Sequence, residues 1–224
     1  MRTRIKICGV CSVEDGALAA RMGADAVGMI MQEGARRYVE VGVARDIVRG
    51  LPPFVTPVGV FVNAAGGKIR EVAGEIGLRS VQLHGAEGEA EIAELADFLV
   101  MKAIKVDQRI GEEIRKWSRI AERHAHFRGL VLETGGTAEA GGTGVENDWT
   151  AIAKAMAESG NVLPIVVAGG LRPDNVEEVV RRLRPYAVDV SSGVEESLRV
   201  KSARKVEDFI EGSRRGDLVG GSAT

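Results

Sequence analysis

Short, nearly all-apolar segments recur along the whole chain and are separated by longer amphipathic segments. The apolar runs are rich in valine, isoleucine and leucine. This composition is typical of strands that are covered by helices and buried on both faces of a parallel sheet. We predict eight such strands, at residues 5–8, 26–31, 58–62, 80–83, 98–104, 129–133, 163–168 and 187–190.

The segments between these strands have the periodicity of amphipathic helices. Two of them also carry helix start signals, because Asp148 precedes Trp149, and Pro173 and Asp174 stand at the beginning of another apolar period. We predict helices that include residues 13–22, 43–49, 67–76, 86–96, 149–157 and 175–183.

The alternation of strand and helix predicts one α/β domain, a single (β/α)8 TIM barrel over residues 1–215. Eight strand–helix units in a chain of 224 residues favour a closed barrel over an open doubly wound sheet. No Gly-x-Gly-x-x-Gly follows the first strand, which disfavours dinucleotide binding. Residues 216–224 are glycine-rich and lack apolar periodicity, so we expect a flexible tail there.

Composition and charge exclude several classes of protein. Lysine and arginine number 30 against 32 aspartates and glutamates, without a block of like charge that would attract nucleic acid or a membrane surface. No apolar run approaches the length of a membrane span, and the beginning of the chain does not resemble a signal peptide. With only two cysteines, the sequence favours a cytoplasmic protein with free thiols, and it leaves open a monomer or a homodimer.

Polar, reactive and glycine residues gather where the predicted strands end. In a barrel of this kind the active site is built at the carboxyl ends of the strands. Glycines and hydroxyls that follow strands six to eight could present donors to a phosphate group, although each glycine could instead serve a tight turn. We therefore expect a small phosphorylated metabolite as ligand, bound by Gly142, Thr143, Gly144, Gly169, Gly170, Ser191, Ser192 and Gly193.

Nine segments, most of them at the predicted strand ends, carry a resemblance to a known family. They are Lys6-Ile7-Cys8-Gly9, Gly23-Ala24-Asp25-Ala26-Val27-Gly28, Arg37-Tyr38-Val39, Val58-Gly59-Val60-Phe61-Val62-Asn63, Val81-Gln82-Leu83-His84-Gly85, Gly141-Gly142-Thr143-Gly144, Asp148-Trp149, Ala168-Gly169-Gly170-Leu171 and Val188-Asp189-Val190-Ser191-Ser192-Gly193-Val194-Glu195. In their order and spacing they resemble the phosphoribosylanthranilate isomerases of tryptophan biosynthesis.

The resemblance implies an Amadori rearrangement of N-(5'-phosphoribosyl)anthranilate to 1-(o-carboxyphenylamino)-1-deoxyribulose 5-phosphate, with no cofactor and no metal. It implies that Cys8 is the general base and that Glu133 stands at the position of the general acid. Arg37 would contact the carboxylate of the anthranilate, and Asp189 a substrate hydroxyl. His84 matches a histidine of the family, and we count it among the substrate-binding residues.

The chain departs from the family pattern around the substrate. Glu133 replaces an aspartate, Ala35 a serine and Met31 an aromatic residue, while Leu198-Arg199 and Ser202 replace a Pro-Gly and a later aspartate. These departures leave open an isomerase for another phosphosugar and a barrel that binds a phosphorylated ligand without turnover.

Both proposed catalytic residues also have alternative interpretations. Cys8 could be a packed, inert cysteine, or it could form a redox pair with Cys11 in a Cys-x-x-Cys motif. Glu133 could be an ordinary carboxylate at the surface end of a strand.

Overall fold

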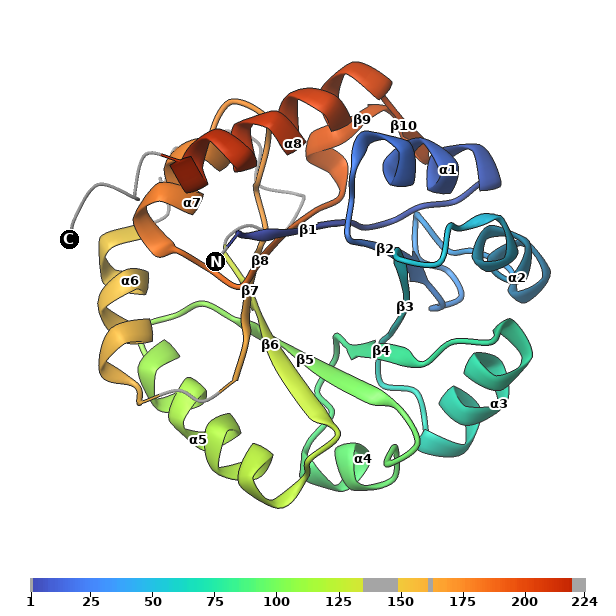
Figure 1. Ribbon diagram of the computed structural model, residues 1–224. Helices are drawn as coiled ribbons and strands as arrows, with labels where there is room; N and C mark the ends of the chain where they lie inside the picture. Colours follow the sequence, from blue (N-terminus) through green and yellow to red (C-terminus); the bar gives the residue numbers. More distant parts are fainter. Residues whose placement is uncertain (1, 135–148, 161–162, 219–224) are drawn as a thin grey trace.

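The predicted strands close into one parallel barrel (Figure 1). The computed structural model describes residues 2–134, 149–160 and 163–218. Each strand pairs with the next along the chain, and the last pairs in parallel with the first. The strands are β1 (Arg4–Ile7), β2 (Ala26–Ile30), β3 (Thr56–Phe61), β4 (Ser80–Leu83), β5 (Leu99–Lys105), β6 (Phe127–Glu133), β7 (Ile165–Ala168) and β8 (Ala187–Val190). The (β/α)8 fold predicted from the sequence is confirmed.

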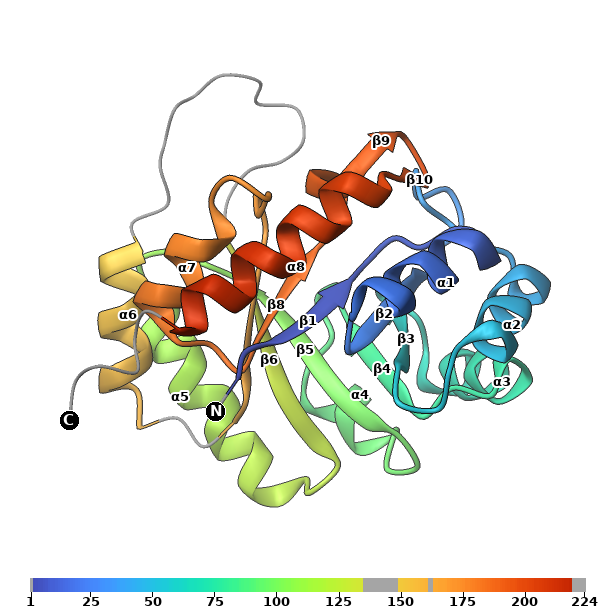
Figure 2. The same ribbon diagram turned by 45° about the horizontal axis from the view of Figure 1, so that its top comes forward.

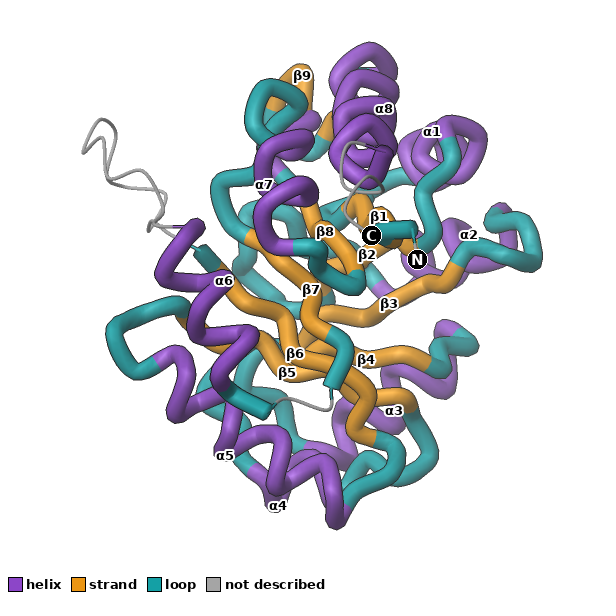
Figure 3. Tube along the Cα trace, turned by 60° about the vertical axis from the view of Figure 1, so that its left-hand side comes forward, coloured by secondary structure: helices purple, strands orange, loops and turns teal. Residues whose placement is uncertain are grey.

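Helices surround the barrel, and neighbouring helices pack on one another, as α6 does on α5 and α7 (Figure 3). Within the described ranges, no helix has both the length and the apolar character needed to cross a membrane. The helices are α1 (Val13–Met22), α2 (Val41–Gly50), α3 (Gly66–Ile76), α4 (Glu89–Ala93), α5 (Ile110–Arg123), α6 (Trp149–Glu158), α7 (Val176–Leu183) and α8 (Ala203–Leu218).

Helix α4 is much shorter than the predicted helix over residues 86–96. The buried Glu87 carboxylate accepts hydrogen bonds from the backbone N–H groups of Asn63 and Gly85, both at 2.7 Å. It also pairs with the buried Lys102, with Nζ 3.0 Å from Oε2. These contacts hold the chain before Gly88 in a turn, so the helix begins only at Glu89.

Three features near the end of the chain were not predicted. A single 3₁₀ turn, η1 (Ser192–Val194), leads into a hairpin of β9 (Glu195–Ser197) and β10 (Val200–Lys201). The hairpin lies beside the beginning of α1 (Figure 2), where the backbone N–H of Lys201 donates to the carboxylate of Asp15 at 3.2 Å. Helix α8 continues to Leu218, so the first three residues of the expected tail are helical.

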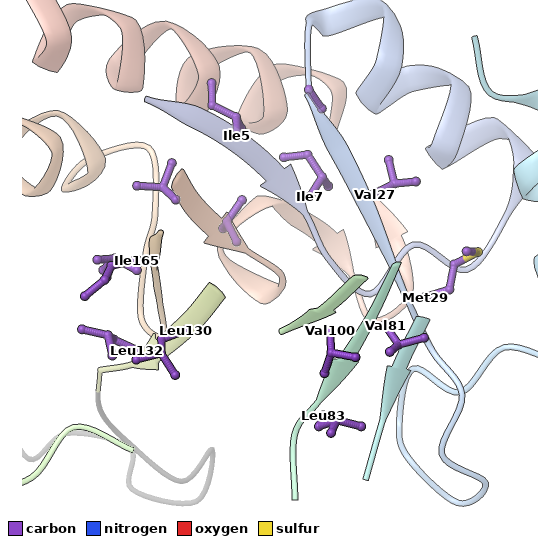
Figure 4. Close-up of a cluster of buried hydrophobic side chains, with 14 of the residues drawn as sticks. Ile5, Ile7, Val27, Met29, Val81, Leu83, Val100, Leu130, Leu132 and Ile165 are labelled. Atoms are coloured by element: carbon purple, nitrogen blue, oxygen red, sulfur yellow. The ribbon is translucent and has the colours of Figure 1, made fainter. Parts of the chain in front are cut away.

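Side chains alternate between the two faces of each strand. On β1, Ile5 and Ile7 are at most 1% exposed and belong to the apolar layer between the strands and helices (Figure 4). The inward face has a second, smaller cluster of mostly small residues, namely Ala103, Val131, Val166, Ala168 and Ala187. Because this inner cluster is small, the carboxyl end of the barrel has room for polar side chains.

Candidate active site

A cavity of about 370 Å³ opens at the carboxyl ends of the strands. It is lined by residues of β2, β3, β4, β6, β7 and β8 and by residues that follow the strands, among them Cys8 after β1. The lining residues are Cys8, Ile30, Gln32, Ala35, Val60, Val62, Gln82, His84, Glu133, Ala168, Gly169, Gly170, Leu171, Asp189, Val190, Ser191, Ser192 and Gly193.

Cys8 follows β1 directly and faces the cavity. Its backbone N–H donates to the carbonyl oxygen of Val190 at 2.7 Å, which extends the pairing of β1 and β8 by one residue. The side chain is buried, and this burial raises the pKa of the thiol, while the positive charge of Lys6 acts against the rise. Since only the thiolate can accept a proton, the charge beside this sulfur matters for its chemistry.

Lys6 and Asp189 form a buried ion pair beside Cys8. Lys6 Nζ lies 2.7 Å from Asp189 Oδ2, and both side chains are 6% exposed. Burial opposes the charge of Lys6, but Asp189 and Cys8 outweigh it, so the pKa of Lys6 is raised and the ammonium group stays charged. The other carboxylate oxygen of Asp189 is buried without a hydrogen-bond partner among the described residues, and it is therefore available to a ligand.

Glu133, His84 and Gln82 form a row on the opposite side of the cavity. His84 Nε2 lies 3.1 Å from Glu133 Oε2, and Gln82 Nε2 lies 3.1 Å from His84 Nδ1. An amide N–H that donates to Nδ1 leaves the ring proton on Nε2, so His84 donates to Glu133. This bond is the main cause that lowers the pKa of the Glu133 carboxyl, against the opposing effect of burial. The carboxyl group is thus held by a defined partner and points at the cavity.

Glycines hold the loops after β6, β7 and β8 close together. Gly169 and Gly170 have φ values of 87° and 66°, a backbone region that favours glycine. A Cβ atom at Gly169 would lie 2.5 Å from the carbonyl oxygen of Thr134, and one at Gly193 would overlap the carbonyl oxygen of Leu171. Both turn geometry and close packing therefore require glycine here, and the same loops face the cavity beside Ser191 and Ser192.

Arg37 is held by Glu195 and does not line the cavity. Its Nε and Nη2 atoms each lie 2.6 Å from one oxygen of that carboxylate, which is a bidentate pair. Lys201 Nζ lies 3.4 Å from Glu195 Oε1 and donates to the carbonyl oxygen of Ser191 at 3.0 Å. Glu195 thus joins the loop after β2 to the hairpin after β8.

Comparisons with known proteins match this chain to one enzyme family. The family model described as "N-(5'phosphoribosyl)anthranilate (PRA) isomerase" matches residues 5–212. A protein of that name from Pseudomonas aeruginosa (strain LESB58) is 41% identical over 219 residues, which are 96% of this chain and 97% of the relative. The chain belongs to the phosphoribosylanthranilate isomerase family.

Solved structures of phosphoribosylanthranilate isomerases superimpose on the whole barrel. The Thermotoga maritima structure has 37% identity and a TM-score of 0.84, with 95% of this chain and 98% of that chain covered. A second Thermotoga maritima structure is of monomers generated from the dimeric enzyme, with a TM-score of 0.77, 32% identity and the same coverage. A third structure, with a TM-score of 0.75, 34% identity and again 95% and 98% coverage, is a complex with reduced 1-(o-carboxyphenylamino)-1-deoxyribulose 5-phosphate.

Of the site residues predicted from the sequence and the isomerase family, most meet in this one cavity. Cys8, His84, Glu133 and Asp189 line it together with Gly169, Gly170, Ser191, Ser192 and Gly193. Arg37 lies beside the site in the pair with Glu195. Gly142, Thr143 and Gly144 lie outside the described residues, so their part in phosphate binding stays a prediction.

Sequence reasoning assigned no role to Lys6, Gln82, Glu195 or Lys201. Two of them could have been found, because Lys6 and Gln82 stand two residues before Cys8 and His84 and therefore share their face of the strand. Glu195 and Lys201 lie on a hairpin that the hydrophobic pattern did not predict, and local sequence gives no signal for their contacts.

Proposed function

We propose that this chain catalyses the isomerisation of N-(5'-phosphoribosyl)anthranilate, as its family membership suggests. The observation that carries the proposal is that a thiol and a carboxyl group, Cys8 and Glu133, face one cavity from different strands. An aminoribose bound between them would meet an acid on one side and a base on the other, as the rearrangement requires.

Ring opening is the first step of the proposed mechanism. Glu133, hydrogen-bonded to His84, delivers a proton to the ring oxygen while the C1–O bond breaks, and the nitrogen lone pair forms the C=N bond of an iminium ion. His84 lowers the pKa of the Glu133 carboxyl, so ring opening requires the form of the enzyme in which this carboxyl carries its proton.

Proton removal from C2 is the second step. The Cys8 thiolate accepts the C2 proton, and the electron pair of the broken C–H bond forms an enolamine. The enolamine becomes the aminoketose when C1 gains a proton and the C2 hydroxyl loses its proton to form the C2 carbonyl. C1 is reduced and C2 is oxidised within one molecule, so the step balances without an external oxidant or reductant.

Binding groups surround the two reacting side chains. Asp189 Oδ1 would accept a hydrogen bond from a ribose hydroxyl, since it is a buried acceptor that lacks a partner among the described residues. The loops that contain Gly169, Gly170 and Gly193, with Ser191 and Ser192, would bind the phosphate. The ion pair with Glu195 does not use Nη1 of Arg37, which would contact the anthranilate carboxylate from the rim.

The test is the decay of substrate fluorescence when purified protein is added to freshly generated N-(5'-phosphoribosyl)anthranilate. Wild type should turn the substrate over, and Cys8→Ser and Glu133→Gln should each lose about 10²–10⁴-fold in kcat. Circular dichroism should show that both variants are folded. Substrate binding without turnover by wild type would instead support a barrel that only binds phosphorylated ligands.

The Arg37–Glu195 pair favours a second candidate, an isomerase for a phosphosugar that lacks the anthranilate carboxylate. A guanidinium that already forms a bidentate pair with one carboxylate stabilises a second carboxylate less. Replacing anthranilate by an uncharged aromatic amine in the substrate would separate the candidates. The first predicts a large loss in kcat/KM, and the second predicts little change or a gain.

We propose a homodimer that forms through the opposite, amino-terminal end of the barrel. Phe54 is 93% exposed there and stands at the edge of a cavity of about 340 Å³ that Tyr186 and Leu99 also line. Phe54→Asp should halve the mass measured by light scattering if this face is the interface.

We also place the protein in the cytoplasm, where the free thiols of Cys8 and Cys11 would stay reduced.

A further inference from the structure

The charge nearest to the Cys8 thiol comes from its own strand. Lys6 and Cys8 stand two residues apart, so both side chains point into the barrel. Gly28 on the neighbouring strand β2 shows how close they are, because a Cβ atom there would lie 2.7 Å from Cys8 Sγ and 3.0 Å from Lys6 Nζ. One methyl group would thus contact both atoms, and the absence of a side chain at Gly28 leaves room for them.

The ammonium group of Lys6 is fixed in place by Asp189 from β8. The 2.7 Å distance to Asp189 Oδ2 and the burial of both side chains leave the lysine little freedom to move away from the sulfur. A buried ammonium group requires such a partner, because an unpaired charge in this environment would be very unfavourable. The pair therefore places a permanent positive charge beside the thiol.

Other charged groups also act on Cys8. Asp189 itself disfavours the thiolate, while Lys201 on the hairpin favours it. Arg37, on the loop after β2, interacts with Cys8 as well, but Glu195 neutralises it. Lys6 has the largest effect among the groups that favour the thiolate, and it works against the burial that disfavours it.

We propose that Lys6 is a positioning residue for the general base: its ammonium group, held by Asp189, stabilises the negative charge on Cys8 before the thiolate takes the C2 proton. The inference rests on the proposed function in that Cys8 is the base. It assigns a role in the reaction to a buried lysine that would otherwise have only a structural role, as the partner of Asp189.

The first experiment titrates the Cys8 thiol by the ultraviolet absorbance of the thiolate, in a Cys11→Ser background so that one thiol reports. Lys6→Met should move the titration to higher pH, and raising the midpoint by one pH unit lowers the thiolate fraction about tenfold at any pH well below it. Lys102→Met is the matched control, because it removes another buried lysine that pairs with a carboxylate, Glu87, away from the cavity. Its Cys8 titration should match that of the background.

A double variant, Lys6→Met with Asp189→Asn, guards against loss of folding. It removes both charges of the pair and leaves no unpaired carboxylate, and it should still titrate above the background protein. The inference is overturned if both Lys6 variants titrate like the background.

Turnover tests the proposed function separately. In Lys6→Met, the acidic limb of the kcat/KM profile should move to higher pH by the same amount as the thiol titration, and at high pH kcat should recover. Wild-type turnover with an unshifted thiol would refute the role of Lys6 and keep the isomerase. A shifted thiol without wild-type turnover would keep the Lys6–Cys8 interaction and refute both the isomerase and the role of Lys6 in it.

Discussion

Gly28→Ala adds one methyl group at the point where the proposed base and its lysine meet. The new Cβ atom would lie 2.7 Å from Cys8 Sγ, whereas comfortable contacts between such atoms begin at about 3.5–4.0 Å. The sulfur must therefore move by roughly 1 Å, because Gly28 lies within β2 and its backbone is fixed by pairing with β3. Overpacking of this kind costs about 1–3 kcal/mol of stability.

The effect on catalysis should exceed the effect on folding. A displacement of about 1 Å in a reacting group can cost about 10²-fold in rate, so we expect kcat/KM to fall by about that factor. The measurement is the initial rate of fluorescence decay over a range of substrate concentrations, together with Tm from circular dichroism.

Gly74→Ala is the matched control for this substitution. Beyond its chain neighbours and the helix's own backbone, no heavy atom lies within 4 Å of a Cβ at Gly74, which is in the last turn of α3. This change should therefore leave activity intact and raise stability by up to about 1 kcal/mol. A Gly28→Ala protein with wild-type kcat/KM and wild-type Tm would refute the reasoning, since it would show that the sulfur is not confined.

Three further predictions concern ion pairs around the site. Lys102→Met leaves the buried Glu87 carboxylate unpaired and should lower the free energy of unfolding, measured in urea, by about 3–5 kcal/mol. Adding Glu87→Gln to this variant should restore part of the loss. An unchanged urea midpoint for Lys102→Met would contradict the prediction. Burial opposes the charge of the Glu87 carboxylate, but Lys102 and backbone N–H donors outweigh this effect and lower the pKa of the carboxyl. The contribution of Glu87 to folding stability is therefore complete above pH 4.5, the ordinary pKa, and is lost as the pH falls through the lower pKa of the folded protein. Urea midpoints measured down that range should fall more steeply for wild type than for Glu87→Gln, and parallel curves would refute the assignment. Arg37→Lys removes the bidentate pair with Glu195 and should lower stability by about 1.5–3 kcal/mol, measured by chemical denaturation, with no change expected if the pair contributes nothing.

The hydrophobic pattern determined the barrel and the location of its site. Strands buried on both faces are continuous apolar runs, so composition alone located all eight. Parallel strands bring their carboxyl ends to the same face, and for this reason Cys8, His84, Glu133 and Asp189 could be expected together from their places in the sequence. Neither step depends on contacts between distant residues.

Only the tertiary structure decided which charges are neighbours. Lys6 and Asp189 are 183 residues apart in sequence, and Arg37 and Glu195 are 158 apart. The first pair meets because β8 closes against β1, and the second because a hairpin after β8 folds back over the loop after β2. Glu87 likewise delays the start of α4 through its contacts with Asn63, just after β3, and with Lys102 on β5. Strand periodicity predicts which face of the sheet a residue occupies, whereas its partner on the neighbouring strand depends on barrel closure and register, which no local pattern encodes.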